Sequence, residues 1–150
     1  METHTRQISR RLHEEHQATL ALWGRLAATL AAGKMDFPLV KSAAAALAGE
    51  IDRHFAFEEA ELFPRLAAAG GADIGELLKE EHQAIRAAAR RFIELAGAQA
   101  AGDETRVLGL ELAERLVSHV QKEEMSLLPM LEDLLDENAD AELTARYAAT

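Results

Sequence analysis

Two polar motifs occur twice in this sequence, in the same order, and this duplication restricts the folds that the chain can adopt. The motif Glu-Glu-His-Gln-Ala occupies residues 14–18 and returns at residues 80–84. A second pattern, His-x-x-x-Glu-Glu-x-x-Leu-x-Pro-x-Leu, begins at His54 and returns at His119. The chain is therefore a tandem of two similar units, and we expect their repeated core positions to meet near a pseudo-two-fold axis.

Both units have the composition of helices. Ala, Leu, Glu and Arg dominate, while β-branched residues are sparse and aromatic residues make up only 5% of the chain. Apolar residues recur at helical spacing, which is typical of helices with one face in a core. The stripes comprise Leu12, Leu20, Trp23 and Leu30; Leu47, Ile51, Phe55 and Leu62; Leu78, Ile85 and Phe92; and Leu112, Leu116, Val120 and Leu127.

Helix breakers divide the chain into four long segments. The breaks are residues 33–38, residues 69–71 and residues 102–103. We expect helices over about residues 6–32, 37–68, 74–100 and 104–135.

Capping residues and prolines refine these limits. Asp36, Asp73 and Asp103 are well placed to cap the helices that follow them. Pro64 and Pro129 fall late in the second and fourth segments, where a proline is expected to kink or end a helix.

Long helices joined by short connections run antiparallel to their neighbours. The sequence therefore predicts an all-α fold, an antiparallel up-down-up-down four-helix bundle built from two tandem helical hairpins. A length of 150 residues with 49% hydrophobic content fits a single domain over residues 1–150. Its core would span about residues 6–135, and the tail, 136–150, would add a short helix through residues 140–147.

Six polar residues of the repeat lie inside the apolar stripes. His16 falls between Leu12 and Leu20, and His82 holds the equivalent place in its own stripe. On the second and fourth segments a His and a Glu stand four residues apart, which places both on one helix face. The six candidate metal ligands are His16, His54, Glu58, His82, His119 and Glu123. We expect them to point at one central volume.

Metal coordination is the interpretation that we favour for this set. One buried His is usually a core residue with a satisfied hydrogen bond, but six such groups without a ligand would cost on the order of several kcal/mol for each unpaired charge. If Glu58 and Glu123 each bridge two ions, each ion receives four protein donors, fewer than the five or six that iron commonly takes. We therefore predict two iron ions (Fe²⁺/Fe³⁺) with a bridging oxide or hydroxide and an open position on each. Manganese and zinc are the alternative ions.

Composition excludes several other classes of site and partner. The chain has no Cys, which excludes disulfides, thiolate zinc sites, iron–sulfur clusters and a cysteine nucleophile. Its net charge of -10 repels nucleic acid and anionic membranes. The polar amino terminus lacks the apolar core of a signal peptide, and no run of about 18 apolar residues occurs. We expect a cytoplasmic protein whose partner is a small molecule.

The ligand pattern resembles the hemerythrin family, specifically its HHE cation-binding branch. That signature, a lone His, then His-x-x-x-Glu, then both again, is matched at all six positions, and the resemblance spans about residues 12–131. It implies a non-haem di-iron centre in a four-helix bundle. The oxygen-carrying hemerythrins have a further histidine four residues after the one on the third helix, whereas this chain has Arg86 there. The symmetric set is instead similar to bacterial iron-centre repair proteins linked to nitric oxide and oxidative stress.

Three functions are consistent with these observations. The leading one is binding of a small diatomic or peroxide (O₂, NO or H₂O₂) at the carboxylate-bridged centre, for sensing, scavenging or storage. A nitrogen-rich site carries less negative charge than a carboxylate-rich one, which should stabilise a ferrous pair. The second is a di-iron enzyme that consumes peroxide or nitric oxide, or a stress-related repair function. The third is a metal-free helical interaction module.

Charged residues beside the six are interpreted as solvated. His13 has Lys79 as its repeat counterpart and is expected to be a partly exposed polar residue, and His4 is expected to be disordered. Hydrogen bonds to the ligand imidazoles are the alternative for some of the adjoining glutamates, Glu15, Glu59, Glu81 and Glu124. Glu124 would be the substitute ligand if Glu123 did not bind.

Overall fold

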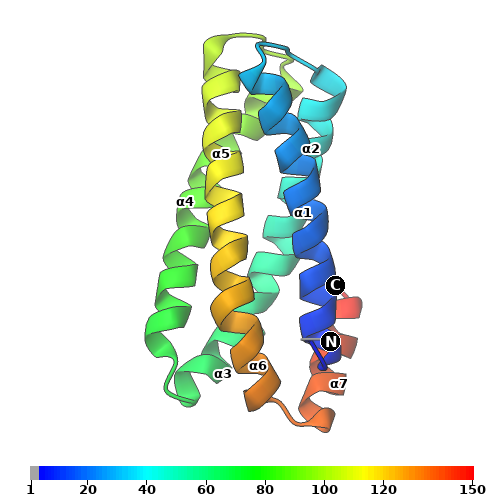
Figure 1. Ribbon diagram of the computed structural model, residues 1–150, viewed down its shortest axis with the longest axis vertical. Helices are drawn as coiled ribbons and strands as arrows, with labels where there is room; N and C mark the ends of the chain where they lie inside the picture. Colours follow the sequence, from blue (N-terminus) through cyan, green and yellow to red (C-terminus); the bar gives the residue numbers. More distant parts are fainter. Residues whose placement is uncertain (1–3) are drawn as a thin grey trace.

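The computed structural model describes residues 4–150, which contain helices and no strand (Figure 1). The first helical stretch is α1 (Gln7–Ala31) and the third is α4 (Ala72–Gly97). The second runs without interruption through α2 (Phe37–Glu50), the π-helical turns η1 (Ile51–Phe55) and η2 (Glu58–Leu62), and α3 (Phe63–Ala68). The fourth comprises α5 (Asp103–Lys122), the π-helical turn η3 (Glu123–Leu127) and α6 (Leu128–Leu134). The prediction of an all-α fold is confirmed.

A further helix, α7 (Glu137–Ala148), begins where the Asp136 side chain accepts a hydrogen bond from the Ala139 N–H at 2.7 Å. It is longer than the short helix expected in the tail. None of the helices within residues 4–150 combines the length and apolar character that a membrane crossing requires.

The helix starts show which capping predictions hold. Asp36 caps α2, because its carboxylate accepts a hydrogen bond from the Leu39 N–H at 3.1 Å. The predictions for Asp73 and Asp103 are wrong, since α4 and α5 begin slightly earlier and place both residues inside the first turn. An acidic side chain there still interacts favourably with the partial positive charge of the helix amino terminus.

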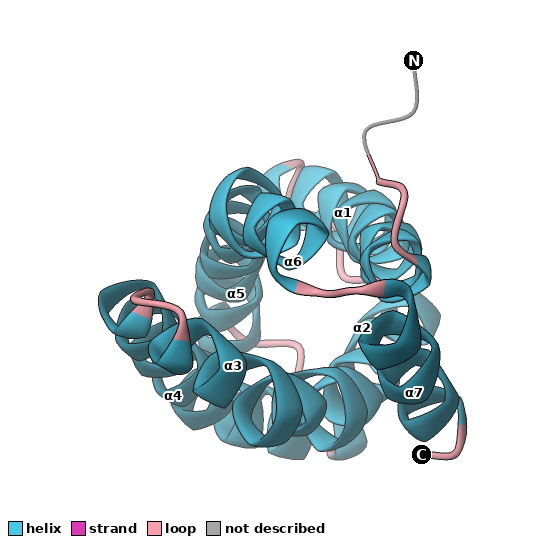
Figure 2. Ribbon diagram, turned by 90° about the horizontal axis from the view of Figure 1, so that it is seen from below, coloured by secondary structure: helices cyan, strands magenta, loops and turns pink. Residues whose placement is uncertain are grey.

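The four stretches lie side by side and surround a common axis when viewed end-on (Figure 2). The colours of Figure 1 run upward along α1, downward from α2 to α3, upward along α4 and downward from α5 to α6. Contacts between elements join α5 to α1 and α4, and join α4 to α2 and α3. The added helix α7 packs against the lower part of α1.

The core consists of two apolar clusters with a polar layer between them. One cluster contains Trp23 and Phe92, which are 1% and 0% exposed, as expected for core residues. The other contains Leu12, Leu78 and Leu127. On each of the four stretches the buried His falls between residues of the two clusters. The fold therefore brings the polar residues to one level.

The prolines end neither helix, because a π-helical turn precedes each of them. Proline lacks an N–H, and in a regular helix its ring collides with the carbonyl four residues back. Here the Phe63 N–H bonds to the carbonyl of Glu58, five residues back, and the Leu128 N–H does the same to Glu123. The wider turns before Pro64 and Pro129 thus begin at two of the candidate ligands, and π-helical turns are frequent at functional sites.

Candidate metal centre

The structure brings all six sequence-predicted residues together in the polar layer. They come from different elements and are each at most 2% exposed. Their positions are His16 on α1, His54 on η1, Glu58 on η2, His82 on α4, His119 on α5 and Glu123 on η3. They form two sets of four donors that share both carboxylates: His16 and His54 with Glu58 and Glu123, and His82 and His119 with the same two glutamates.

Glu58 lies between the two histidine pairs. Its Oε2 is 3.0 Å from His54 Nε2, and its Oε1 is 3.2 Å from His82 Nε2. One oxygen therefore faces each set of donors.

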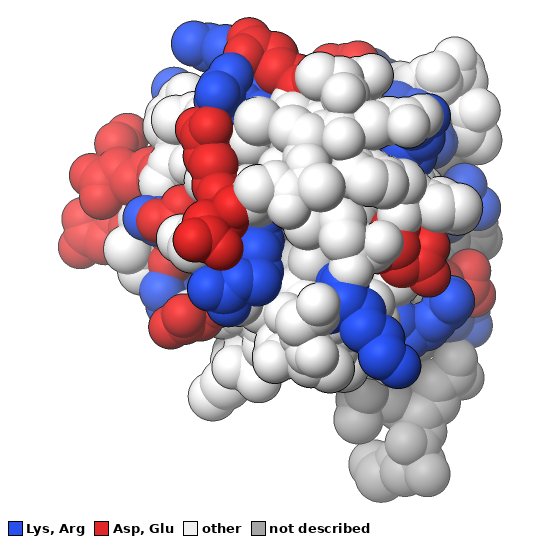
Figure 3. All heavy atoms as spheres, turned by 90° about the horizontal axis from the view of Figure 1, so that it is seen from above, with Lys and Arg blue, Asp and Glu red and all other residues white. Residues whose placement is uncertain are grey.

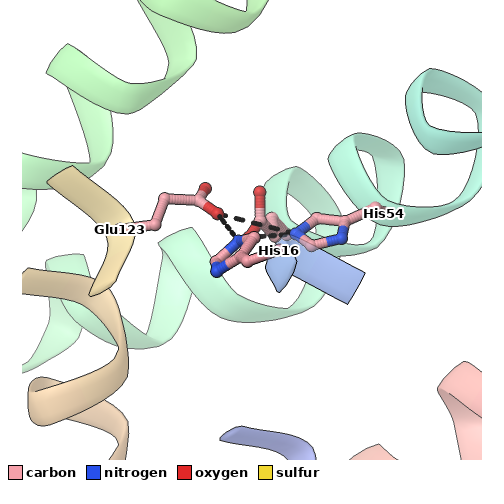
Figure 4. A group of neighbouring side chains, drawn as sticks. His16, His54 and Glu123 are labelled. Carbon is pink, nitrogen blue, oxygen red and sulfur yellow. Dashed lines mark hydrogen bonds and ion pairs between the residues drawn. The ribbon is translucent and has the colours of Figure 1, made fainter. Parts of the chain in front are cut away.

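Glu123 repeats this arrangement from the opposite side of the layer. Its Oε1 lies 2.8 Å from His16 Nε2 and 3.5 Å from His54 Nε2. Its Oε2 lies 3.1 Å from His119 Nε2 and 3.7 Å from His82 Nε2. Figure 4 shows His16 and His54 turned toward the Glu123 carboxylate from separate helices.

The donor spacing fits the size of a transition metal ion. Imidazole nitrogens and carboxylate oxygens bind such ions at about 2.0–2.2 Å, which places neighbouring donors about 2.9–3.4 Å apart. The separations of 2.8–3.7 Å between Glu123 oxygens and imidazole nitrogens bracket this range. The two buried oxygens Glu58 Oε1 and Glu123 Oε2 make no hydrogen bond. The residues present therefore fit two cations that share both carboxylates.

Each of the four imidazoles is held from outside by a second glutamate. The Nδ1···carboxylate distances are 2.6 Å for His16–Glu124, 3.0 Å for His54–Glu15, 2.6 Å for His82–Glu59 and 2.8 Å for His119–Glu81. An ionised carboxylate can only accept a hydrogen bond, so each Nδ1 donates. In the neutral imidazole the Nε2 lone pair then faces the centre, which is the form that binds metal.

These four glutamates, called the outer carboxylates below, correct the expectation that they are solvated side chains. Each of these carboxylates accepts a hydrogen bond from the imidazole on the helical stretch that follows its own in the chain. Glu124 on the fourth stretch bonds to His16 on the first, so the four bonds form a closed ring around the layer. The repeat places one of these glutamates directly beside His16, Glu58, His82 and Glu123, but a sequence does not reveal which neighbouring helix such a side chain faces.

The outer carboxylates are themselves paired with further donors, most of them near the surface. Glu59 forms an ion pair with Arg86 at 2.7 Å. Arg86, which occupies the position of the missing fifth histidine, therefore helps to orient His82 through Glu59. Glu81 pairs with Lys122, and Glu15 accepts a hydrogen bond from the Tyr147 hydroxyl of α7. Glu124 pairs with His13 at 2.6 Å.

The contacts within the layer shift its pKa values strongly. Burial lowers the pKa of His16, but hydrogen bonds to Glu123 and Glu124 outweigh burial and raise it to about 9. Burial also opposes charge on His119, while the negative charge of the nearby Glu123 carboxylate raises that pKa to about 10. Burial favours the neutral form of Glu123, yet the surrounding imidazoles hold its pKa well below the usual value. Without a metal ion, protonated imidazoles therefore balance the negative charge of the buried carboxylates.

A cavity of about 260 Å³ reaches the layer from one side. Its lining includes His54 together with Glu15, Trp23, Glu50 and Tyr147. No other member of the six lines it, so among the candidate ligands it leads to the His16–His54 side.

The fold and the site together define a helical protein with a buried His/Glu centre suited to cations. The sequence matches the hemerythrin HHE cation binding domain over residues 7–131, which is most of the chain. No curated protein and no solved structure matches the chain significantly. The chain belongs to the hemerythrin HHE cation-binding domain family.

The raised imidazole pKa values predict a pH dependence of metal binding. A metal ion needs the Nε2 lone pairs, and the raised pKa values of His16 and His119, about 9 and 10, favour the protonated form of these two imidazoles at neutral pH. Zinc added to metal-free protein should release protons at pH 7, and its affinity should rise as pH approaches 9 to 10. Titration in chelator-buffered zinc measures the affinity. A constant or falling affinity over this range would contradict the assignment.

The outer carboxylates should tune metal affinity. Replacing Glu81 by Ala removes the acceptor for His119 Nδ1, and loss of such a partner typically weakens metal binding about 10–100-fold. The adjacent exposed residue supplies the control, because Glu80→Ala should leave the affinity unchanged. Competition with a chelator dye measures both variants, and equal affinities would show that the Glu81 contact does not orient a ligand.

Proposed function

We propose that the six buried residues hold two iron ions and that the protein binds a small diatomic or peroxide at this centre. The observation that carries the proposal is the position of Glu58 and Glu123, each of which presents one oxygen to each histidine pair. We infer that the helices form the up-down-up-down bundle of two hairpins that such a symmetric centre requires.

The donor set supports iron with open coordination positions. Each site would receive two imidazole nitrogens and two carboxylate oxygens, so an ion that takes five or six donors keeps room for a bridging oxide or hydroxide and for an added ligand. A di-iron pair bound here would supply reversible redox chemistry and open positions for O₂, NO or H₂O₂. The protein's own part is to hold the imidazoles in place through the outer carboxylates and to exclude bulk water from the layer.

The cavity beside His54 supports a small molecule as the partner. It connects with the layer at one histidine pair, so we propose that the exogenous ligand approaches the ion of His16 and His54. Trp23 and the neighbouring α1 residue Leu22 contribute apolar surface to it, and Glu50 contributes a carboxyl whose pKa burial raises. Because the lining has two carboxyl groups, Glu15 and Glu50, and one guanidinium, Arg53, it suits small uncharged molecules better than anions.

The net negative charge of the protein supports the proposal that nucleic acid is not one of its partners. The net charge is -10, and on the end of the bundle seen in Figure 3 acidic and basic side chains lie next to one another. Arg91, for example, is paired with Glu94 and Glu104. A phosphate backbone would require a surface with excess positive charge.

The bridging role of Glu58 predicts a joint loss of both ions. In Glu58→Ala each site loses one of its two shared oxygens, so metal content should fall from about two ions per chain to less than one. Glu61→Ala is the matched control, because Glu61 is one helical turn away and pairs with Arg146 at the surface. Metal analysis after desalting, with circular dichroism as a check on folding, gives the comparison. Full occupancy in Glu58→Ala would rule out the bridging assignment.

Ligand binding to the ferrous protein tests the function itself. Protein loaded anaerobically with iron should bind NO, O₂ or peroxide with changes in its absorption spectrum, and metal-free protein should show none. Stopped-flow measurements of NO association with Gly49→Phe test whether the ligand enters through this cavity. Gly49 lines the cavity beside His54 and has open space around it. This variant should slow NO association several-fold with unchanged iron content.

Gly24→Phe is the control for this experiment, because Gly24 has equal space but lines a different surface depression, away from the six residues. Sustained consumption of peroxide or NO would assign the protein to the enzymes rather than the binders. Protein that takes up no metal and keeps its stability would favour the helical interaction module and overturn the proposal.

A further inference from the structure

A third group of metal-binding side chains lies outside the centre, beside His16. His4, in the segment before α1, His13 on α1 and Glu124 on η3 place one potential ligand atom each within 4.8 Å of one another. His13 Nδ1 is 2.6 Å from Glu124 Oε1, and His4 Nε2 is 3.8 Å from the same oxygen. The two imidazole rings are 4.7 Å apart. His4 was expected to be disordered, but the structure places it in this contact.

An ordinary surface interaction does not account for all three side chains. His4 Nδ1 is buried and makes no hydrogen bond, and the other ring nitrogen, Nε2, is 3.8 Å from Glu124 Oε1, which is beyond hydrogen-bond distance. Two imidazoles also converge on one carboxylate oxygen, where a single protonated imidazole would be enough to pair its charge. We propose that His4, His13 and Glu124 form an outer site for one divalent transition metal ion.

The geometry needs only small adjustments to bind an ion. Bonds of about 2.0–2.2 Å in tetrahedral coordination would place the donors about 3.3 Å apart. The Glu124–His13 separation of 2.6 Å would open slightly, and the Glu124–His4 separation of 3.8 Å would close slightly. The side chains of His4, His13 and Glu124 are 14%, 36% and 22% exposed, so water can supply the remaining donors.

The donor types select the class of ion. Two imidazoles with one carboxylate suit zinc, nickel, cobalt or ferrous iron, whereas magnesium and calcium prefer oxygen donors only. The outer site is also confined to one half of the repeat. In the other half, Lys79 takes the place of His13, and Glu59, the counterpart of Glu124, is paired with Arg86. One ion per chain is therefore expected.

Glu124 connects the outer site to the buried centre. Its Oε1 faces His13 and His4, while its Oε2 accepts the hydrogen bond from His16 Nδ1 at 2.6 Å. An ion on Oε1 would draw charge from the oxygen that supports His16, so the two sites would influence each other's affinity reciprocally. This coupling rests on the proposed function of the buried centre, whereas binding at the outer site does not.

Zinc binding to tag-free, iron-loaded protein tests the outer site. Equilibrium dialysis with analysis of both metals should find one zinc per chain in addition to the iron. His13→Lys, which copies the residue of the other half, should lose that zinc and retain the iron. Lys79→Ala is the matched control and should keep both.

His4→Ala provides a second test, since His4 lies outside every helix and its removal leaves the core intact. Equal zinc uptake by the unaltered protein and the two histidine variants would overturn the outer site, as would zinc that enters only by displacing iron. If the buried centre fills with zinc in place of iron, the histidine variants should still bind one ion fewer. Failure of the iron proposal is thus distinguishable from failure of this one.

Discussion

Glu58 and Glu123 are completely buried, and a carboxylate in a protein interior is stable as an anion only when donors or cations surround it. Four imidazoles surround these two, and the outer carboxylates hold each imidazole from behind. Surface groups such as Arg86 and Lys122 then pair with the outer carboxylates. Charge therefore alternates in sign from the centre to the surface. Removing one of the six central side chains leaves its neighbours with an unpaired polar atom among groups that are at most 2% exposed.

The same layer separates two apolar clusters, and this division explains how the helical fold accommodates a polar interior. Residues such as Trp23 and Phe92 above the layer and Leu12 and Leu127 below it supply the hydrophobic stabilisation. The polar layer would fix the relative height of the helices, because a slip of one turn would separate Glu58 Oε1 from His82 Nε2. The π-helical turns at Glu58 and Glu123 let both glutamates face the centre while the chain continues through the following prolines.

Much of this arrangement was predictable because the sequence contains the same motifs twice. Apolar periodicity and breakers predicted the helices to within a few residues, and the repeated His and Glu inside those stripes predicted the six residues that meet. The capping errors at Asp73 and Asp103 arose because a first-turn Asp and a capping Asp look alike in sequence. The outer carboxylates were missed because their partners lie on other helices. The position of His4 likewise depends on a contact with Glu124 that is remote in sequence.

Anomalous X-ray diffraction from crystals of the iron-loaded protein, recorded at the iron absorption edge, tests the central claim most directly. Two iron peaks are expected in the polar layer, one between His16 and His54 and one between His82 and His119, with an oxygen of Glu58 and of Glu123 on each. A single iron site, or iron bound only outside the layer, would contradict the two shared carboxylates from which the rest of the account follows.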